Sequence, residues 1–295
     1  MKNNSSSKNK NNTNAPKLSF YRLSPLQEKI LVSLACYKFL TTGQLLELST
    51  VSDRAYLNKL LVNLKNRSQP LVGSITFGVH PQLGKLQSIH YITTHSVELL
   101  RELFGEHYPV RFPKGKHGLF QQDYFHRVHT IEVHIALTKW AELNGIEVGY
   151  FCTYFDKLSS GKNKGHRAES AIHLSDNEYL IADALCILKT PAREELYAIE
   201  MYNGNDTHRV HGSLFQHLHA LKKGQPSRQF GLKHGSRVLC VFEFEVYKVQ
   251  AMKRLSEDER FANAKKHFLF KSLEKLKTED FFEWRLFDGE KTGVF

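Results

Sequence analysis

Two acidic residues lie inside apolar segments of this sequence. Asp183 is in LIADALCIL and Glu200 is in LYAIEMY, and the turn-like segment KTPAREE separates them. A buried carboxylate is costly unless a cation or hydrogen bonds compensate its charge. Carboxylate oxygens are the ligands that Mg²⁺ and Mn²⁺ prefer, and such an ion lowers the pKa of water for attack on a phosphodiester. We therefore predict that Asp183 and Glu200 are metal ligands in a catalytic site.

A third acidic residue, Glu132, lies in HRVHTIEVHIAL, where the apolar spacing predicts a helix. His129 lies three residues before Glu132 and shares its helical face, and His126 lies one turn earlier. A helix that precedes the first strand of a sheet can bring an acid to the strand carboxylates. We therefore predict Glu132 as the third metal ligand and a member of the same catalytic site.

Each acid also has an ordinary structural interpretation. Asp183 could belong to a turn or an ion pair, and Glu200 could pair with Arg209 or Lys222. The histidines around Glu132 could line an amphipathic surface, because their spacing is not that of a zinc site. What favours a metal site is the joint order of a helix Glu, a strand Asp and a strand Glu.

The elements that must position these acids alternate between helical and extended patterns. The acidic segments over 179–188 and 196–202 predict an antiparallel hairpin, because only a short turn joins them. The other predicted elements are a helix over 123–145, a strand over 146–155, a helix over 206–224, a strand over 237–244, and helices over 245–255 and 258–276. This order predicts an α/β (α+β) domain over 121–295, with one mixed sheet flanked by helices.

The front of the chain predicts a different module over 18–105. Three helices are expected in LSPLQEKILVSLACYKF, with Ser24 as N-cap, in TTGQLLELS, and in SDRAYLNKLLVNLKNR, which is expected to begin at Ser52. Two strand-like runs follow in PLVGSITFGVHPQLGKLQSIHYIT, and HSVELLRELFG closes the module as a helix. Three helices and a hairpin in this order predict a winged helix-turn-helix.

The third predicted helix has a leucine stripe and an opposite polar face that suits a DNA groove. That face and the hairpin tip supply the predicted DNA-binding residues: Arg54, Asn58, Lys59, Asn63, Lys65, Arg67 and Lys85. Modules of this kind also serve in dimerisation or protein docking, which is the alternative interpretation.

Positive charge is concentrated in the same half of the chain. Residues 1–122 contain 16 Lys and Arg against 6 Asp and Glu, whereas residues 123–295 contain 25 against 24. This distribution favours a polyanionic partner, namely double-stranded DNA. Residues 1–17 add four of the lysines and are expected to form a disordered basic tail, and residues 106–120 are expected to be a linker.

The remaining composition is that of a globular protein. No apolar run approaches the about 18 residues that a membrane span needs, and the N-terminus lacks the apolar core of a secretory signal. The cysteines are far apart and form no CxxC pair, as in reduced cytoplasmic proteins; they are Cys36, Cys152, Cys186 and Cys240. We therefore expect a cytoplasmic protein without a membrane span.

Over about residues 22–285 the sequence resembles the replication-relaxation family of plasmid proteins and the related MobC-type relaxases. The resemblance rests on LTTGQLLELS, YLNKLLVNLKNR and LVGSI in the front half, and on HRVHTIEVHIAL, ADALCIL, YAIEMYNGN and RVLCVFEF in the back half. It implies a winged helix joined to a nuclease-like domain of the PD-(D/E)xK type, with Glu132, Asp183 and Glu200 as its acidic site. It also implies nicking at a plasmid transfer origin during mobilisation or conjugation, with relaxosome or coupling proteins as partners.

Two positions depart from the nuclease motif. Ala182 stands where proline is common, and Tyr202 stands where a lysine usually helps to activate the water. Because strand side chains alternate, Tyr202 is expected on the same face as Glu200. We predict either that a lysine enters from the next helix, as Lys222 or Lys223, or that Tyr202 acts as a positioning hydroxyl or a nucleophile.

Three functions follow from these patterns. The first is a metal-dependent, site-specific DNA nicking endonuclease, a hydrolase of the relaxase kind that uses Mg²⁺ or Mn²⁺. The second is a non-catalytic DNA-binding regulator of replication or transcription with a decayed nuclease-like domain, which the missing lysine favours. The third is a protein-interaction adaptor. The acids in apolar strands favour the first, because a decayed site has no physical reason to keep them.

Overall fold

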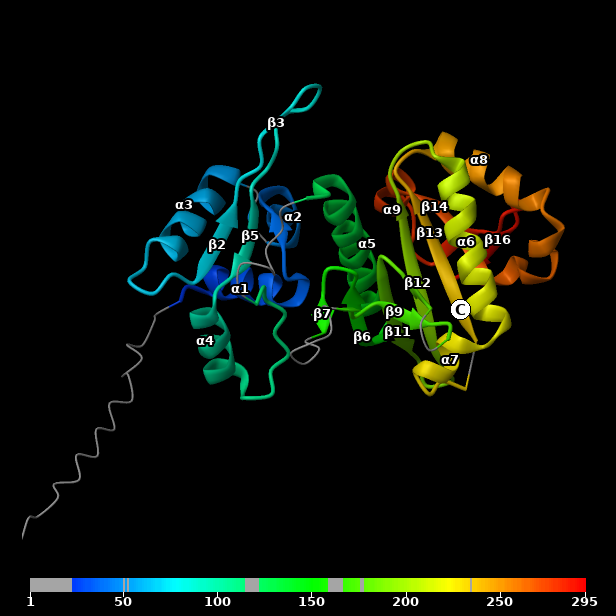
Figure 1. Cartoon of the computed structure of the whole chain (residues 1–295). Coiled ribbons are helices and arrows are strands. Elements are labelled where there is room, and N and C mark those ends of the chain that lie inside the picture. The colour runs from blue at the N-terminus through cyan, green and yellow to red at the C-terminus, as the bar shows by residue number, and fades with distance from the viewer. Residues whose placement is uncertain are drawn as a thin grey trace, which may run out of the picture.

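The computed structural model describes residues 23–49, 51, 53–114, 122–158, 167–175, 178–233 and 235–295. The predicted basic tail, the predicted helix start at Ser52 and part of the predicted linker lie outside these residues. The described chain is a mixture of helices and sheets in two parts, with helix α5 (Tyr124–Leu143) between them (Figure 1). None of the described helices is long and apolar enough to cross a membrane.

The N-terminal part packs helices around a small antiparallel sheet. Ser24 caps the first helix through a reciprocal capping box with Gln27, and Thr41 caps the second in the same way with Gln44. The N-cap of the third helix is Asp53. The helices are α1 (Pro25–Tyr37), α2 (Thr42–Leu48), α3 (Arg54–Lys65) and α4 (Thr94–Phe104).

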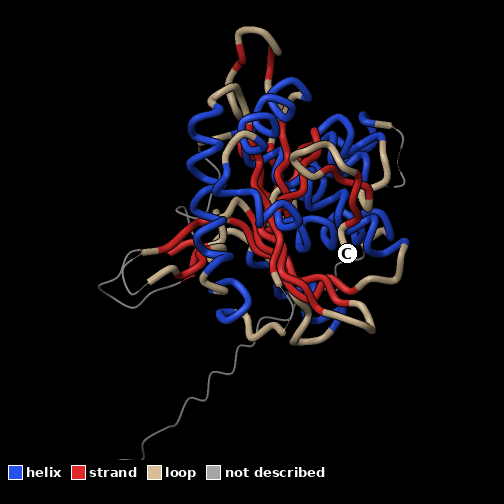
Figure 2. The backbone as a smooth tube through the Cα atoms, turned by 90° about the vertical axis from the view of Figure 1, so that its right-hand side faces the viewer, coloured by secondary structure: helices blue, strands red, loops and turns tan. Residues whose placement is uncertain are grey.

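A long hairpin projects from this part. The sheet has the order β1-β5-β2, formed by β1 (Leu40–Thr41), β5 (Ile89–Ile92) and β2 (Val72–Ile75), and all its pairs are antiparallel. Beyond the sheet, β3 (Val79–His80) and β4 (Gly84–Lys85) continue the hairpin to a tip that stands clear of the helices (Figures 1 and 2). The helices and hairpin therefore follow one another in the predicted order.

The C-terminal part is built on a seven-stranded mixed sheet of order β16-β15-β14-β13-β12-β11-β6. The predicted acidic hairpin is confirmed, since β11 and β12 pair antiparallel, and β12, β13 and β14 then run parallel. The strands are β6 (Glu147–Thr153), β11 (Ala184–Lys189), β12 (Glu194–Tyr202), β13 (Ser236–Phe242), β14 (Phe268–Ser272), β15 (Glu283–Arg285) and β16 (Lys291–Gly293).

Helices cover both faces of this sheet. Side chains of α5 share one apolar cluster with Ile199 and Met201 of β12. Side chains of α6 share another with Ala198 and Tyr202 of the same strand, as alternation requires. The other helices of this part are α6 (Thr207–Lys222), α7 (Gln225–Gln229), α8 (Glu245–Ser256), the 3₁₀ helix η2 (Glu259–His267) and α9 (Leu273–Thr278). The end of β12 thus lies between α5 and α6.

Two sequence predictions in this part were wrong. The strand expected over 179–188 is broken at Asp183: β10 (Tyr179–Ile181) pairs with β9 (Ala171–His173), and only β11 belongs to the main sheet. The short strands β7 (Lys157–Leu158) and β8 (Arg167–Ala168) form a separate pair.

The helix expected over 258–276 is instead η2, β14 and α9. All five residues of β14 are buried, and a short, fully buried apolar strand has no alternation to distinguish it from a helix.

The two parts are joined by buried contacts. Val128, Ile131 and Ile135 of α5 pack in the apolar core of the N-terminal part. Asp156 lies 2.7 Å through Oδ1 from Nζ of Lys38, and its Oδ2 pairs with Arg111. Burial alone would raise the pKa of Asp156. The positive charges of Arg111 and Lys38 outweigh burial and hold that pKa well below its usual range. The described part of the predicted linker is therefore packed.

Candidate active site

The hairpin register places Asp183 and Glu200 together. Ala184 pairs with Ile199 and Leu185 with Ala198, so Asp183, the residue before β11, stands opposite Glu200. Facing residues of an antiparallel pair have their side chains close together. The two predicted catalytic acids thus meet where β12 approaches its carboxyl end, which in α/β sheets is the usual edge for a ligand site.

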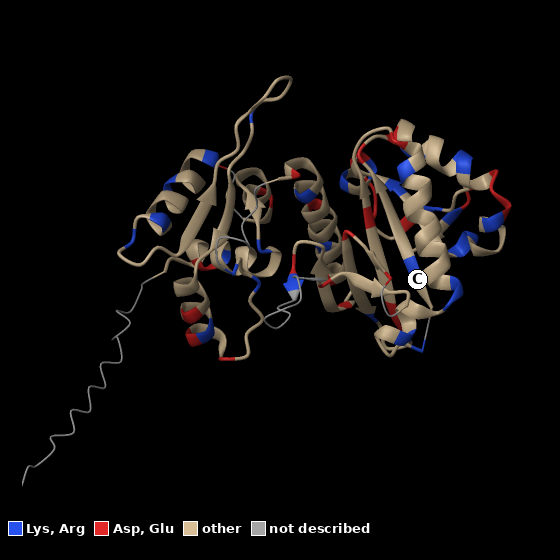
Figure 3. Ribbon diagram, viewed as in Figure 1, with Lys and Arg blue, Asp and Glu red and all other residues tan. Residues whose placement is uncertain are grey.

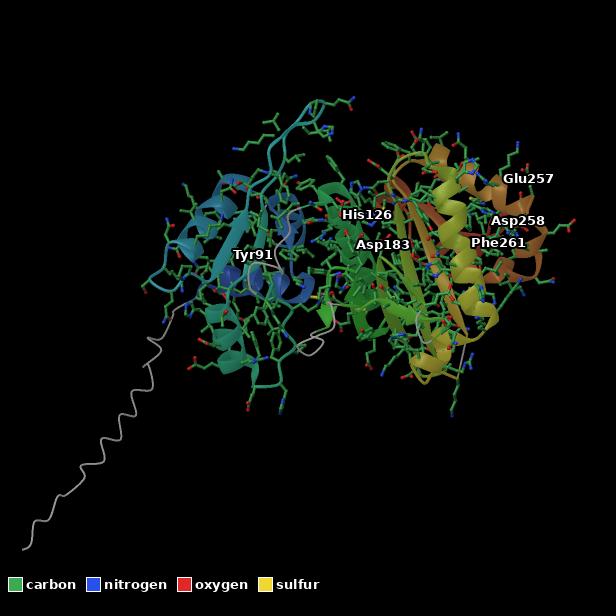
Figure 4. The ribbon with its side chains drawn as sticks, viewed as in Figure 1. Tyr91, His126, Asp183, Glu257, Asp258 and Phe261 are labelled. Carbon is green, nitrogen blue, oxygen red and sulfur yellow. The ribbon has the colours of Figure 1, made fainter. Side chains whose placement is uncertain are left out.

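Asp183 is fixed by hydrogen bonds to both of its carboxylate oxygens. Its Oδ2 accepts from the backbone N–H of Met201 at 2.7 Å, and its Oδ1 lies 2.8 Å from Nε2 of His126 on α5 (Figure 4). Burial lowers the pKa of His126, but the hydrogen bond and charge of Asp183 outweigh burial, so the pKa is raised. The charge of Arg209 opposes that rise. The carboxylate therefore keeps one orientation beside a basic imidazole.

Glu200 is held from the other face of the sheet, by α6. Its Oε1 lies 2.6 Å from Nε2 of His217, and its Oε2 accepts from the hydroxyl of Ser213 at 3.3 Å. Glu200 and His217 are both buried. Burial, followed by the negative charge of Asp183, raises the pKa of Glu200, while His217 opposes this rise. The charge of Asp183 therefore acts on Glu200, which indicates that the two carboxylates lie near each other.

The structure does not bring Glu132 to this pair. Its Oε2 lies 3.0 Å from Nζ of Lys277 on α9. Among the described residues no three His, Cys, Asp or Glu side chains converge as a metal-binding group. The prediction of Glu132 as third ligand is wrong, because the helix rotation that buries Val133 and Leu137 directs Glu132 to α9.

Tyr202 points to the same side of the strand as Glu200, as alternation predicted, but it lies in the core. Its ring packs against Phe242, with ring centroids 4.9 Å apart, and its hydroxyl lies 3.3 Å from that of Ser213. Burial, followed by the charge of Glu200, raises its pKa well above the usual value. Tyr202 therefore lies in the core and contacts Ser213 rather than facing solvent.

The predicted substitute lysine is also elsewhere. Lys222 lies at the far end of α6, where its Nζ donates to the backbone carbonyl of Arg260 at 3.3 Å. It is five residues beyond His217, which is about 7.5 Å further along the helix axis. Lys223 caps the same end of the helix. Neither lysine faces the acidic pair.

Sequence reasoning missed His217 and Ser213 and gave His126 only a neighbouring place. Ser213 and His217 are four residues apart, so they share one helical face. That spacing was visible in THRVHGSLFQHLH, but nothing in the sequence indicated that this face lies over Glu200. His126 was visible one turn before His129, and it contacts Asp183 rather than Glu132.

The acidic pair fits a hard divalent cation by its donor chemistry. Mg²⁺ is commonly held by only one or two carboxylates, with water and substrate phosphate in its other positions. Burial, followed by the negative charge of Asp183, raises the pKa of Glu200, and a bound cation would offset both effects. Each carboxylate oxygen already accepts one hydrogen bond, which orients the carboxylate and leaves a lone pair for the cation.

The predicted DNA-binding residues gather on one surface of the N-terminal part. Lysine and arginine follow α3 on its outer side (Figure 3). Arg54, Asn58, Lys59 and Asn63 are exposed, as is Lys85 on the hairpin, whereas Lys65 and Arg67 are half-buried. An open groove along α3 is lined by Ala55, Asn58, Lys59, Val62, Asn63, Asn66 and Arg67. Asn58, Lys59, Asn63 and Arg67 of the predicted set therefore line one groove, whereas Lys85 lies apart on the hairpin.

Two of these residues are anchored and three are free to bind. Gln27 of α1 donates to Oδ1 of Asn63 at 2.9 Å and accepts from Arg67 at 3.3 Å. Within the described ranges, the side chains of Arg54, Lys59 and Lys85 have no hydrogen-bond or ion-pair partner. Unpaired exposed cations beside an anchored helix are suited to a polyanion.

Comparisons with protein-family models, with curated proteins and with solved structures returned no match for this chain. Function is therefore inferred from the geometry of the acidic pair and of the α3 surface.

Proposed function

We propose that the protein binds double-stranded DNA and cleaves one strand at the Asp183–Glu200 pair. The observation on which this proposal depends is that the half-buried Asp183 and the buried Glu200 converge near the carboxyl end of β12, in a molecule whose other part presents exposed cations without partners among the described residues. A buried carboxylate whose pKa is raised by burial and by the charge of a second acid is typical of sites that bind a cation or move a proton. The basic surface indicates the substrate class.

The finer features of the fold support the same proposal. The order of α1 to α4 with a projecting hairpin supports a winged helix, in which α3 would enter the major groove and the hairpin would contact phosphate. Apart from the short strands β7 to β10, the order α5, β6, β11, β12, α6, β13 supports the PD-(D/E)xK nuclease core that the sequence resemblance implies. Under this proposal α3 selects the site and the acidic pair cuts.

The protein's own side chains would organise the reaction. Asp183 and Glu200 would hold a divalent cation, which when bound supplies an acidified water and stabilises negative charge on the phosphate. Met201 and His126 fix the orientation of Asp183, and His217 fixes that of Glu200. The resemblance to plasmid mobilisation proteins makes a transfer origin the proposed target.

A nicking assay tests this proposal. Supercoiled plasmid that carries the cognate transfer origin should be converted to open circles by wild type with Mg²⁺ or Mn²⁺, and not with EDTA. Asp183→Asn keeps the shape of the side chain but removes its charge, so we expect at least a roughly 10²-fold slower rate. Equal nicking by Asp183→Asn would contradict the assignment of the acidic site.

One observation favours a second candidate, a DNA-binding regulator without catalysis. Neither Tyr202 nor a lysine of α6 supplies the group that a nuclease motif normally places beside its acids. For this candidate, wild type would bind duplex DNA and never nick it under any metal. The same assay, run with a binding measurement, separates the two functions.

A further inference from the structure

Arg209 lies in the first turn of α6, on the helix that holds Glu200. Its backbone N–H donates to Oδ1 of the N-cap Asp206 at 2.9 Å, which fixes the start of the helix. Its side chain is exposed and has no hydrogen-bond or ion-pair partner within the part of the chain that the structure describes. An arginine without a partner is available for an external anion.

The helical spacing aligns this arginine with the residues that hold Glu200. Arg209, Ser213 and His217 are separated by four residues each, so they form one stripe along α6. Ser213 and His217 both bond the Glu200 carboxylate, so the stripe faces the acidic pair. Arg209 lies one turn, about 6 Å, nearer the helix N-terminus than Ser213.

That end of the helix lies at the edge where the substrate would enter. α6 begins five residues after the last residue of β12, so its first turn stands beside the carboxyl end of that strand. Asn203, the first residue of the connection, contacts His129 of α5 at 3.4 Å.

We propose that Arg209 binds the phosphate that is cleaved, in place of the lysine that the nuclease motif has at Tyr202. This inference rests on the proposed function. Arginine keeps its proton at all relevant pH values, so it cannot activate water as a base. It instead forms paired hydrogen bonds to phosphate oxygens and stabilises the charge that develops on them. The first N–H groups of α6 add positive potential at the same edge.

The test compares Arg209→Gln with Arg209→Lys and with Lys222→Gln. Lys222→Gln is the matched control, because this substitution removes one positive charge from the same helix at the end remote from the acids. Single-turnover nicking of supercoiled origin plasmid should fall about 10²–10³-fold in Arg209→Gln. Arg209→Lys should recover part of the rate, and Lys222→Gln should nick like wild type.

A second measurement does not depend on cleavage. Binding of a short fluorescent DNA duplex is measured against salt concentration, and each lost phosphate contact should reduce the slope of log Kobs against log salt by about 1. We expect this reduction for Arg209→Gln and no change for Lys222→Gln.

The outcomes separate the two proposals. If wild type does not nick, catalysis is refuted, and the salt slope alone decides whether Arg209 contacts phosphate. If wild type nicks and Arg209→Gln nicks as fast as Lys222→Gln, the role of Arg209 is refuted and that of the acidic pair stands. An unchanged slope also overturns the phosphate contact, and a wild type that binds no duplex overturns both proposals.

Discussion

The charged side chains of the α3 surface and of the acidic pair differ in exposure and in hydrogen bonding. On α3 and the hairpin, Arg54, Lys59 and Lys85 are exposed and lack partners among the described residues. At the sheet edge, Asp183 and Glu200 are largely buried, and every carboxylate oxygen has a hydrogen-bond partner. A surface that binds a polyanion gains by leaving its charges free, because binding releases counterions. A site that performs chemistry must instead hold each group in one orientation.

The N-terminal and C-terminal parts are connected by a cluster of charged side chains around Asp156. Asp156 accepts hydrogen bonds from Lys38 of the N-terminal part and from the backbone and hydroxyl of Thr153, besides its pairing with Arg111. Removing one partner of a buried ion pair leaves the others uncompensated, which is far costlier than removing a surface pair.

The largest expected effect is therefore the loss of stability when Asp156 is replaced. Asp156→Asn should lower the free energy of unfolding by about 3–5 kcal/mol at pH 7, measured by urea denaturation. Asp288→Asn, which breaks a surface pair with Lys265, should cost at most about 1 kcal/mol. If both variants cost the same, the parts are not coupled through Asp156.

The stabilising effect of Asp156 should also depend on pH. The pKa of Asp156 in the folded protein is lowered, so its contribution to stability is present above the unfolded-state pKa of about 3.9 and is lost as pH falls toward the folded value. The difference in stability between wild type and Asp156→Asn should therefore shrink as pH falls below about 4.

The next effect concerns the α3 surface. Arg54→Gln with Lys59→Gln should weaken binding of a fluorescent DNA duplex roughly tenfold and reduce the salt slope by about 2, because each cation is assigned one phosphate contact. Lys253→Gln with Lys266→Gln removes the same charge from the C-terminal part and should change binding much less. Equal losses in the two double variants would mean that net charge, rather than α3, binds the DNA.

Local elements could be predicted from the sequence wherever pattern and capping agreed. The capped helices α1 and α2, the β11–β12 hairpin and the pairing of Asp183 with Glu200 are of this kind. The strand β14 could not be recognised, because Phe268, Leu269 and Phe270 are buried on both faces and show no alternation.

The residues that surround the acids were harder to predict from the sequence than the acids themselves. Whether Glu132 or His126 reaches Asp183 depends on the rotation of α5, which is set by Val133 and Leu137 packing under the sheet. The contact of His217 with Glu200 depends on how α6 crosses the opposite face. Such tertiary relations are not encoded in the spacing of a single helix, so a sequence can indicate the acids without indicating what surrounds them.

We propose that Asp183 and Glu200 form one cation site from which Glu132 is excluded. Calorimetric titration of Mn²⁺ into wild type, Glu200→Gln and Glu132→Gln tests it most directly. We predict one Mn²⁺ per chain for wild type and Glu132→Gln, and at least a roughly tenfold weaker affinity for Glu200→Gln. Because the pKa of Glu200 is raised, wild-type affinity should fall as pH is lowered toward that pKa. Equal affinity of wild type and Glu200→Gln, or a loss of binding in Glu132→Gln, would contradict the claim.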